Sequence, residues 1–151
     1  MVIVELEGMV GAIATLDGIG VRIQDVRGMS RDILLAAQAD TDQRFESAPR
    51  VESGGAVFGG INWPPLSVEY LRANPRRAGG QVLRDYGTLQ QSYGIGQAGN
   101  ISTVGSNEIV YGSALPKARG LARKRPQVFL HAELIQAVTN IVEAYALGGL
   151  V

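Results

Sequence analysis

Few side chains in this sequence have the type and spacing that catalysis requires. His131 is the only histidine and there is no cysteine, so a zinc site or a histidine-activated nucleophile has at most one candidate. The string GIGQAG (residues 94–99) lacks the spacing and the following helix of a dinucleotide-binding loop. Glu5 and Glu7 share a face of a predicted strand, but two-carboxylate chemistry also needs a cleft. We therefore expect no catalytic, cofactor-binding or metal-binding residues, and a protein that is not an enzyme.

Basic side chains are concentrated in one part of the chain. Residues 71–125 carry nine Lys and Arg residues but only Asp85 and Glu108 as acids, a net charge of +7, and the rest of the chain balances it at −7. The densest run is KARGLARKRP (residues 117–126), predicted to be a loop. Its five basic residues are Lys117, Arg119, Arg123, Lys124 and Arg125. Because no aromatic residue interrupts the run, stacking on single-stranded bases is not indicated. Contact with an acidic protein surface, contact with phosphates and plain solvation all remain open.

The only tryptophan lies in a long segment rich in Gly and Pro. Residues 48–80 contain two Gly-Gly pairs before Trp63 and the Pro64-Pro65 pair after it. A connector of this length is usually functional or disordered, and a tryptophan can bury a large area in an interface. One hypothesis is an arm that reaches a neighbouring subunit; the other is that Trp63 pins the segment onto its own core. The expected interface residues are Trp63, Pro64, Pro65, Leu66, Ser67, Arg76 and Arg77.

The composition indicates one domain with a modest core, spanning residues 1–151 and including the arm at about 48–80. Of the 151 residues 46% are hydrophobic and 19% are charged. A low charged fraction fits a surface that partners cover, and it equally fits an ordinary loop-rich domain. The absence of cysteine excludes a disulfide framework. No run approaches the roughly 18 apolar residues that cross a bilayer, and the start MVIVELEG is not a signal peptide. We expect no membrane contact.

The elements that must position these residues form an α+β pattern. Residues 2–6 (VIVEL) are predicted to form a strand, and residues 9–16 have helical apolar spacing. A second helix, capped by Ser30 or starting earlier at Asp25, is predicted to end near Ser47.

Beyond the arm, the second half is predicted to form a small antiparallel sheet and a helix. Ser67 can cap a short helix over residues 68–73, and Asp85 a turn through Leu89. Residues 92–97 and 100–105 are predicted to form a hairpin, with residues 108–111 as a third strand. The last element, residues 129–147, is an amphipathic helix with an apolar face of five residues: Leu130, Leu134, Val138, Ile141 and Tyr145. His131, at its start, could cap it, face solvent or meet a partner.

Four segments resemble the phage virion morphogenesis or tail completion family, which includes the Mu-like G protein. NWPPLS (62–67) resembles its W-x-P-L-S signature, and VLRDYGTLQQS (82–92) its I-L-x-D-T-G-x-L-x-x-S segment. VGSNEIVYGSAL (104–115) resembles V-G-T-x-x-x-Y-A, and RKRPQVFL (123–130) resembles the closing P-A-R-P-F-L. The segments occur in the family's order over residues 45–130.

The resemblance implies a structural subunit of a ring at the tail end or the head–tail joint, either a tail terminator or a neck protein. Six copies are favoured and twelve are the alternative. The implied partners are other copies, the tail tube protein, and the head–tail connector or portal-proximal proteins. The basic run would face an adjacent ring or, without sequence specificity, DNA in the lumen. The implied location is the virion, assembled in the host cytoplasm. The alternative is a homo-oligomeric protein-binding adaptor outside any virion.

Overall fold

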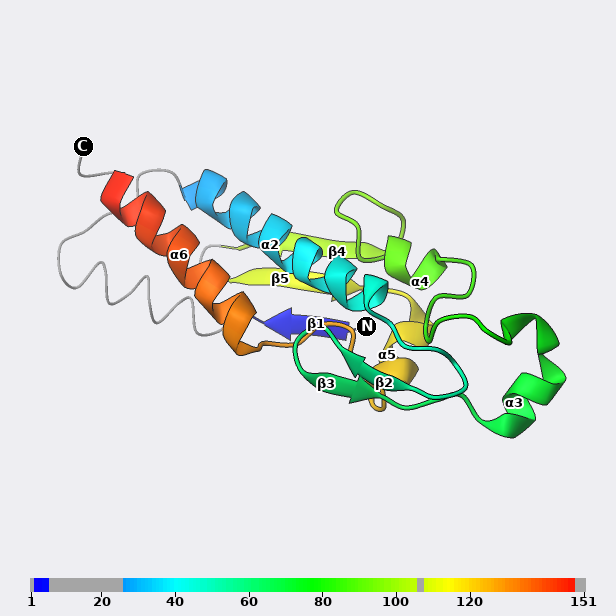
Figure 1. The fold of residues 1–151 in the computed structure, drawn as a ribbon. Helices are drawn as coiled ribbons and strands as arrows, with labels where there is room; N and C mark the ends of the chain where they lie inside the picture. The colour runs from blue at the N-terminus through cyan, green and yellow to red at the C-terminus, as the bar shows by residue number, and fades with distance from the viewer. Residues whose placement is uncertain (1, 6–25, 106–107, 149–151) are drawn as a thin grey trace.

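The computed structural model describes residues 2–5, 26–105 and 108–148 of the chain. They form a mixed α+β fold (Figure 1), which confirms the predicted class. The elements in chain order are β1 (Val2–Glu5), α2 (Val26–Glu46), β2 (Gly55–Val57), β3 (Ile61–Trp63), α3 (Val68–Ala73), the 3-10 turn η1 (Pro75–Arg77), α4 (Thr88–Gln91), β4 (Asn100–Val104), β5 (Ile109–Ser113), α5 (Pro116–Ala122) and α6 (Ala132–Gly148).

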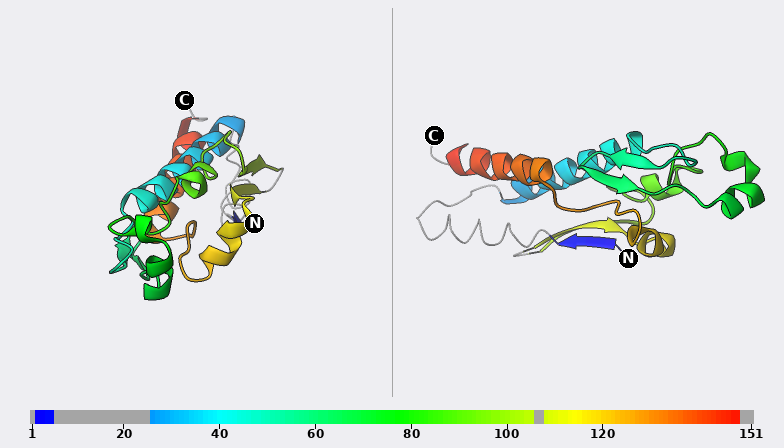
Figure 2. Two further views of the ribbon diagram at one scale, coloured as in Figure 1. Left: turned by 90° about the vertical axis from the view of Figure 1, so that its right-hand side faces the viewer. Right: turned by 60° about the horizontal axis from the view of Figure 1, so that its bottom comes forward.

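Two antiparallel sheets lie in this part of the chain. The larger has the order β1-β5-β4, so the central strand β5 pairs Tyr111 with Val4 on one side and with Ser102 on the other. The smaller is the β2–β3 hairpin, in which Ala56 pairs with Asn62. Helices α2 and α6 run side by side in one layer, with the three-stranded sheet beneath them (Figure 2). The fold therefore has two layers, with its core between them.

Helix α2 forms because its apolar residues recur every three or four positions. Ile33, Ala37 and Phe45 are all buried on the face that this spacing defines. The helix already begins at Val26, and Ser30 lies within its first turns, where its hydroxyl donates to the carbonyl of Val26 at 2.7 Å. The prediction of Ser30 as the cap is therefore wrong. The alternative cap, Asp25, and the helix predicted over residues 9–16 lie outside the described residues.

Aromatic rings connect the layers through the middle of the core. Phe45 of α2 contacts Trp63 of β3 edge-on, with ring centroids 5.7 Å apart. Phe45 also lies 6.0 Å from Tyr93, which in turn lies 6.2 Å from Tyr111 of β5. Burial raises the pKa of both tyrosine hydroxyls, and Tyr111 donates its proton to the carbonyl of Tyr93 at 2.6 Å. The hairpin, α2 and the sheet thus share one core.

The predicted arm, residues 48–80, is only partly an arm. Its first half folds onto the core, since Val51, Val57 and Trp63 are buried, and the β2–β3 hairpin orders the Gly-rich stretch. The second half does project. Helix α3 has no buried residue and stands at one end of the molecule (Figure 1). The Ser67 hydroxyl accepts from the amide of Tyr70 at 3.2 Å, which confirms the predicted cap.

Four local predictions fail. Residues 92–97 form successive turns rather than a strand, and β4 pairs with β5 instead. The predicted basic loop contains helix α5, with Pro116 in its first turn, where a missing N–H is tolerated. Asp85 caps nothing, because α4 begins after Gly87 and the Asp85 carboxylate binds Arg76. The last helix begins at Ala132 rather than at residue 129, and Leu130 remains 44% exposed.

A strap formed by residues 125–127 ties the elements together. The carbonyl of Pro126 accepts from Trp63 Nε1 at 3.0 Å. The side-chain oxygen of Gln127 accepts from the Tyr93 hydroxyl at 2.8 Å, and its main-chain carbonyl accepts from Arg44 Nη1 at 2.6 Å. One short segment therefore satisfies buried donors from β3, α2 and the loop after α4.

Candidate interaction groove

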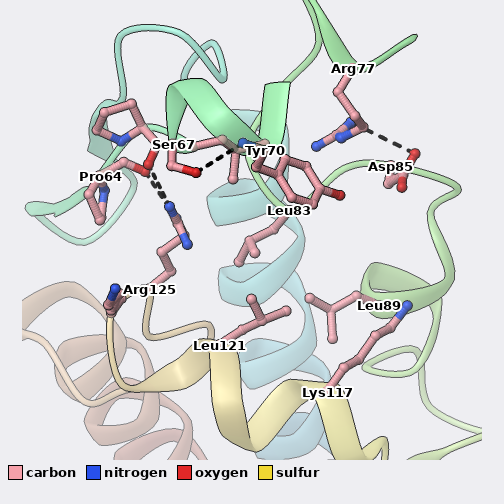
Figure 3. A pocket seen from close by; sticks show the side chains of 13 residues that line it. Pro64, Ser67, Tyr70, Arg77, Leu83, Asp85, Leu89, Lys117, Leu121 and Arg125 are labelled. Carbon is pink, nitrogen blue, oxygen red and sulfur yellow. Dashed lines mark hydrogen bonds and ion pairs between the residues drawn. The ribbon is translucent and has the colours of Figure 1, made fainter. Parts of the chain in front are cut away.

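Eight of the twelve residues expected to contact partners line one groove, and members of the two sets lie on its opposite walls (Figure 3). The groove has a volume of about 610 Å³. One wall comes from the arm and from residues 83–89, and the other from α5 and the start of the strap. The lining residues are Pro64, Pro65, Leu66, Ser67, Tyr70, Arg77, Leu83, Asp85, Leu89, Lys117, Leu121, Lys124 and Arg125.

Trp63 itself does not line the groove. Its side chain is fully buried, packs against Phe45 and donates to the strap. Of the two hypotheses, the one in which Trp63 pins the segment onto its own core is confirmed, and the side chain itself is not available to a neighbouring subunit. The cause is the alternation of strand β3, which turns Trp63 toward the core while Asn62 faces solvent. The buried tryptophan fixes the position of the next two residues, Pro64 and Pro65, which line the groove.

Arg125 joins the two walls. Its Nε donates to the carbonyl of Pro64 at 3.0 Å and its Nη2 to that of Pro65 at 2.7 Å. The residue is 8% exposed, and burial lowers the pKa of its guanidinium. Pro64 and Pro65 lie beyond the end of β3, outside the hairpin ladder, and the arginine satisfies their carbonyls.

The two arginines of η1 have different roles. Arg77 is buried and donates to the carbonyls of Gln81 at 3.0 Å and Arg84 at 3.2 Å, so it holds the groove wall in place. Arg76 lies outside the groove and binds the Asp85 carboxylate with both of its terminal nitrogens. That hydrogen bonding lowers the pKa of Asp85 and raises the pKa of Arg76. Arg76 also stacks over Tyr86, 4.4 Å from the ring centroid.

Helix α5 divides its basic residues between the groove and the solvent. Lys117 lines the groove and donates to the hydroxyl of Thr88 at 2.6 Å, and Lys124 lines it from just beyond the helix. Arg119 and Arg123 are exposed and do not line the groove. Four lining cations against the single acid Asp85 give the groove a net charge of +3. Three cations of the predicted basic run (residues 117–126) therefore line the groove, and the other two lie outside it.

The apolar floor of the groove was not foreseen from the sequence. Leu83, Leu89 and Leu121 point toward one another at its centre (Figure 3). The spacing of Lys117 and Leu121 would have placed both on one face, but only if residues 116–122 had been predicted to be helical. Leu83 has a φ of 60°, unusual for a residue with a side chain, and nothing in the sequence signals it.

His131 belongs to a separate, partly buried cluster between α2 and the start of α6. Its Nε2 contacts the Asp40 carboxylate, and its Nδ1 lies 2.8 Å from Glu133, whose pKa this contact lowers. The other oxygen of Asp40 accepts from Arg44 at 2.6 Å. The ring therefore joins α2 to the start of α6. Among the described residues, no group of three or more His, Asp or Glu side chains has a geometry that could hold a metal ion.

No family model matches the chain, and no curated protein or solved structure is significantly similar to it. Among the helices that the structure describes, none combines the length and the apolar character that crossing a membrane requires.

Proposed function

We propose that this chain is a non-enzymatic structural subunit of a phage or phage-like particle. In this proposal it forms a homo-oligomeric ring at the tail end or the head–tail joint, caps the tail tube and presents a surface to the connector. The proposal begins with the four sequence segments that resemble the virion morphogenesis or tail completion family. Its action is assembly through protein contacts.

The observation that carries the proposal is the convergence of these segments on one groove. The first contributes Pro64 and Ser67, the second contributes Asp85 and Leu89, and the fourth contributes Arg125. They are far apart in the chain, so a common location is not a consequence of sequence proximity. The third segment differs, since its Tyr111 lies in the core. An apolar groove with a charged rim fits the anatomy of a protein interface.

Ring formation also requires two different surfaces on each subunit. In a head-to-tail ring, one patch of each subunit contacts a different patch of the next subunit. The ring closes when a whole number of the rotations between subunits makes a full turn. The division of charge into a +7 part and a −7 part of the sequence can supply such complementary patches. The projecting helix α3 and the groove beside it form one such patch at one end of the molecule (Figure 1).

Native mass spectrometry and negative-stain microscopy of the purified full chain test this proposal. We expect a closed ring with a central hole, with a mass of six copies favoured and twelve copies as the alternative. A monomer that persists at micromolar concentrations would refute the ring. A compact oligomer without a hole would refute it too, and would favour the homo-oligomeric adaptor.

A further inference from the structure

Three cations of the groove have no carboxylate partner in the described part of the chain. Lys117 bonds only a hydroxyl, Arg125 bonds two carbonyls, and Lys124 makes no ion pair there. The one acid nearby, Asp85, is already held by Arg76. A buried guanidinium without a counter-ion is costly, and Arg125 is 8% exposed. The groove therefore carries positive charge that its own residues do not neutralise, and this favours the binding of an anionic group.

The floor of the groove indicates the kind of anion. Leu83, Leu89 and Leu121 form an apolar centre between the cations. A phosphate backbone would leave these leucines without apolar contacts, since its contacts are polar and charged. A protein surface that carries a carboxylate beside an aliphatic side chain would satisfy both the cations and the floor. The occupant that fits is an acidic and apolar protein surface.

The outer face of α6 has that chemistry. The helix has two acids, Glu133 and Glu143, and no basic residue. Glu143 is exposed, and Leu147, one helical turn further on, is 64% exposed. Residues four apart lie on the same face, so this turn presents a carboxylate next to an aliphatic side chain. A glutamate close to a helix C-terminus is unfavourable by itself, and a cationic surface opposite it would offset that repulsion.

The two surfaces lie in different parts of the molecule. Figure 1 shows the C-terminal end of α6 at one extremity and α3, which borders the groove, at the other. The same separation is visible in the right-hand view of Figure 2. A subunit therefore cannot fill its own groove with this part of α6. Copies related by a rotation can bring the groove of one to the α6 of the next.

We propose that the groove binds the outer face of α6 from a second copy of this chain, with Glu143 between Lys117 and Lys124 and with Leu147 on the leucine floor. The inference rests on the proposed ring and names the contact that would build it. It assigns the groove to subunit–subunit contact rather than to nucleic acid.

A charge-exchange experiment tests the contact. In the double variant Lys117→Glu with Lys124→Glu, the groove and Glu143 repel each other. In Glu143→Lys, the groove and the new cation repel each other. We expect each variant alone to weaken self-association at least about tenfold, as the loss of an interfacial charge pair does. An equimolar mixture should restore the ring with the two variants alternating, because both junctions then pair opposite charges.

Matched controls lie outside the proposed contact. The double variant Arg119→Glu with Arg123→Glu makes the same change of charge around α5 outside the groove, and Glu46→Lys reverses an exposed acid at the end of α2 that does not line the groove. Both should keep the wild-type mass distribution. All substituted side chains are exposed, so thermal melting of each variant should match the wild type.

The outcomes separate this inference from the proposed function. A wild-type monomer refutes the ring itself. A wild-type ring that persists in the groove double variant refutes the assigned contact and leaves the ring standing. Loss of assembly in each variant without recovery in the mixture also refutes the pairing of groove and α6. If the groove double variant keeps its ring but loses affinity for a double-stranded oligonucleotide, the groove is a phosphate site instead.

Discussion

Replacing Arg44 by methionine tests whether the buried polar cluster stabilises the packing of α2 against the strap. The Arg44 side chain is completely buried, with none of its surface exposed. It donates to Asp40 at 2.6 Å, to the carbonyl of Gln127 at 2.6 Å and to the carbonyl of Phe58 at 3.0 Å. Methionine keeps much of the length of the side chain but removes all three donors.

The expected loss follows from what the substitution leaves behind. Asp40, itself 6% exposed, would remain a buried carboxylate whose one remaining partner among the described residues is His131, and two carbonyls would lose a donor. Breaking a buried ion pair by removing one partner costs roughly 3–5 kcal/mol in free energy of unfolding. For a chain of this size that corresponds to a fall of about 6–20 °C in melting temperature.

Urea denaturation followed by tryptophan fluorescence measures this change, since Trp63 is the only tryptophan and lies in the same core. Arg31→Met is the matched control, because its side chain is 74% exposed on the same helix, and it should change the free energy by less than about 0.5 kcal/mol. Asp40→Asn should also destabilise the protein. In the double variant with Arg44→Met, the loss in free energy of unfolding should be smaller than the sum of the two single losses. A loss below about 1 kcal/mol for Arg44→Met would refute the reasoning.

Three further predictions concern the anchor, a turn and acid stability. Trp63→Phe leaves the carbonyl of Pro126 without its donor and should cost about 2 kcal/mol in urea unfolding; an unchanged midpoint would contradict the role of this bond. Gly59→Ala should destabilise more than Gly60→Ala by at least about 1 kcal/mol. Both residues have positive φ, but a Cβ at Gly59 would meet an aromatic ring at 2.8 Å, whereas one at Gly60 meets nothing within 4 Å; equal melting temperatures would count against this. The pKa of Asp85 is lowered by its arginine partner, so the stability it contributes is present above its ordinary pKa of 3.8 and lost as the pH falls through the folded-state value. Asp85→Asn should therefore make unfolding less dependent on pH below 4, and an identical pH profile in both proteins would argue against the ion pair.

Periodic apolar spacing made the long helices predictable from the sequence. α2 and α6 have buried residues at three- and four-residue steps, as in Ile33, Ala37, Leu134 and Val138, and such spacing is the strongest local signal available. The cap at Ser67 was predictable for a similar reason, because the side chain and the amide that it binds lie three residues apart.

Elements that depend on distant contacts were not predictable in the same way. The sequence of residues 92–97 is typical of a strand, but the carbonyl of Gly94 accepts a hydrogen bond from the amide of Gln97 in a tight turn. Strand β4 pairs instead with β5, which follows it in the chain. The charge of residues 117–126 suggested a loop, yet Pro116 starts a helix that directs Lys117 and Arg119 to different surroundings. The groove brings together segments about 60 residues apart in the sequence. No local sequence pattern predicts that such distant segments come into contact.

The strap has a consequence for how the chain matures. Its bonds to Trp63 and Arg44 span 63 and 83 residues of sequence, so both groups are synthesised well before their acceptors leave the ribosome. A nascent chain that ends before residue 126 holds an indole without its acceptor and an Arg44 guanidinium that lacks one of its three acceptors. The anchoring of Trp63, and with it the groove wall formed by Pro64 and Pro65, becomes complete only when Pro126 has emerged. Incomplete chains would accordingly lack the surface on which we expect assembly to depend.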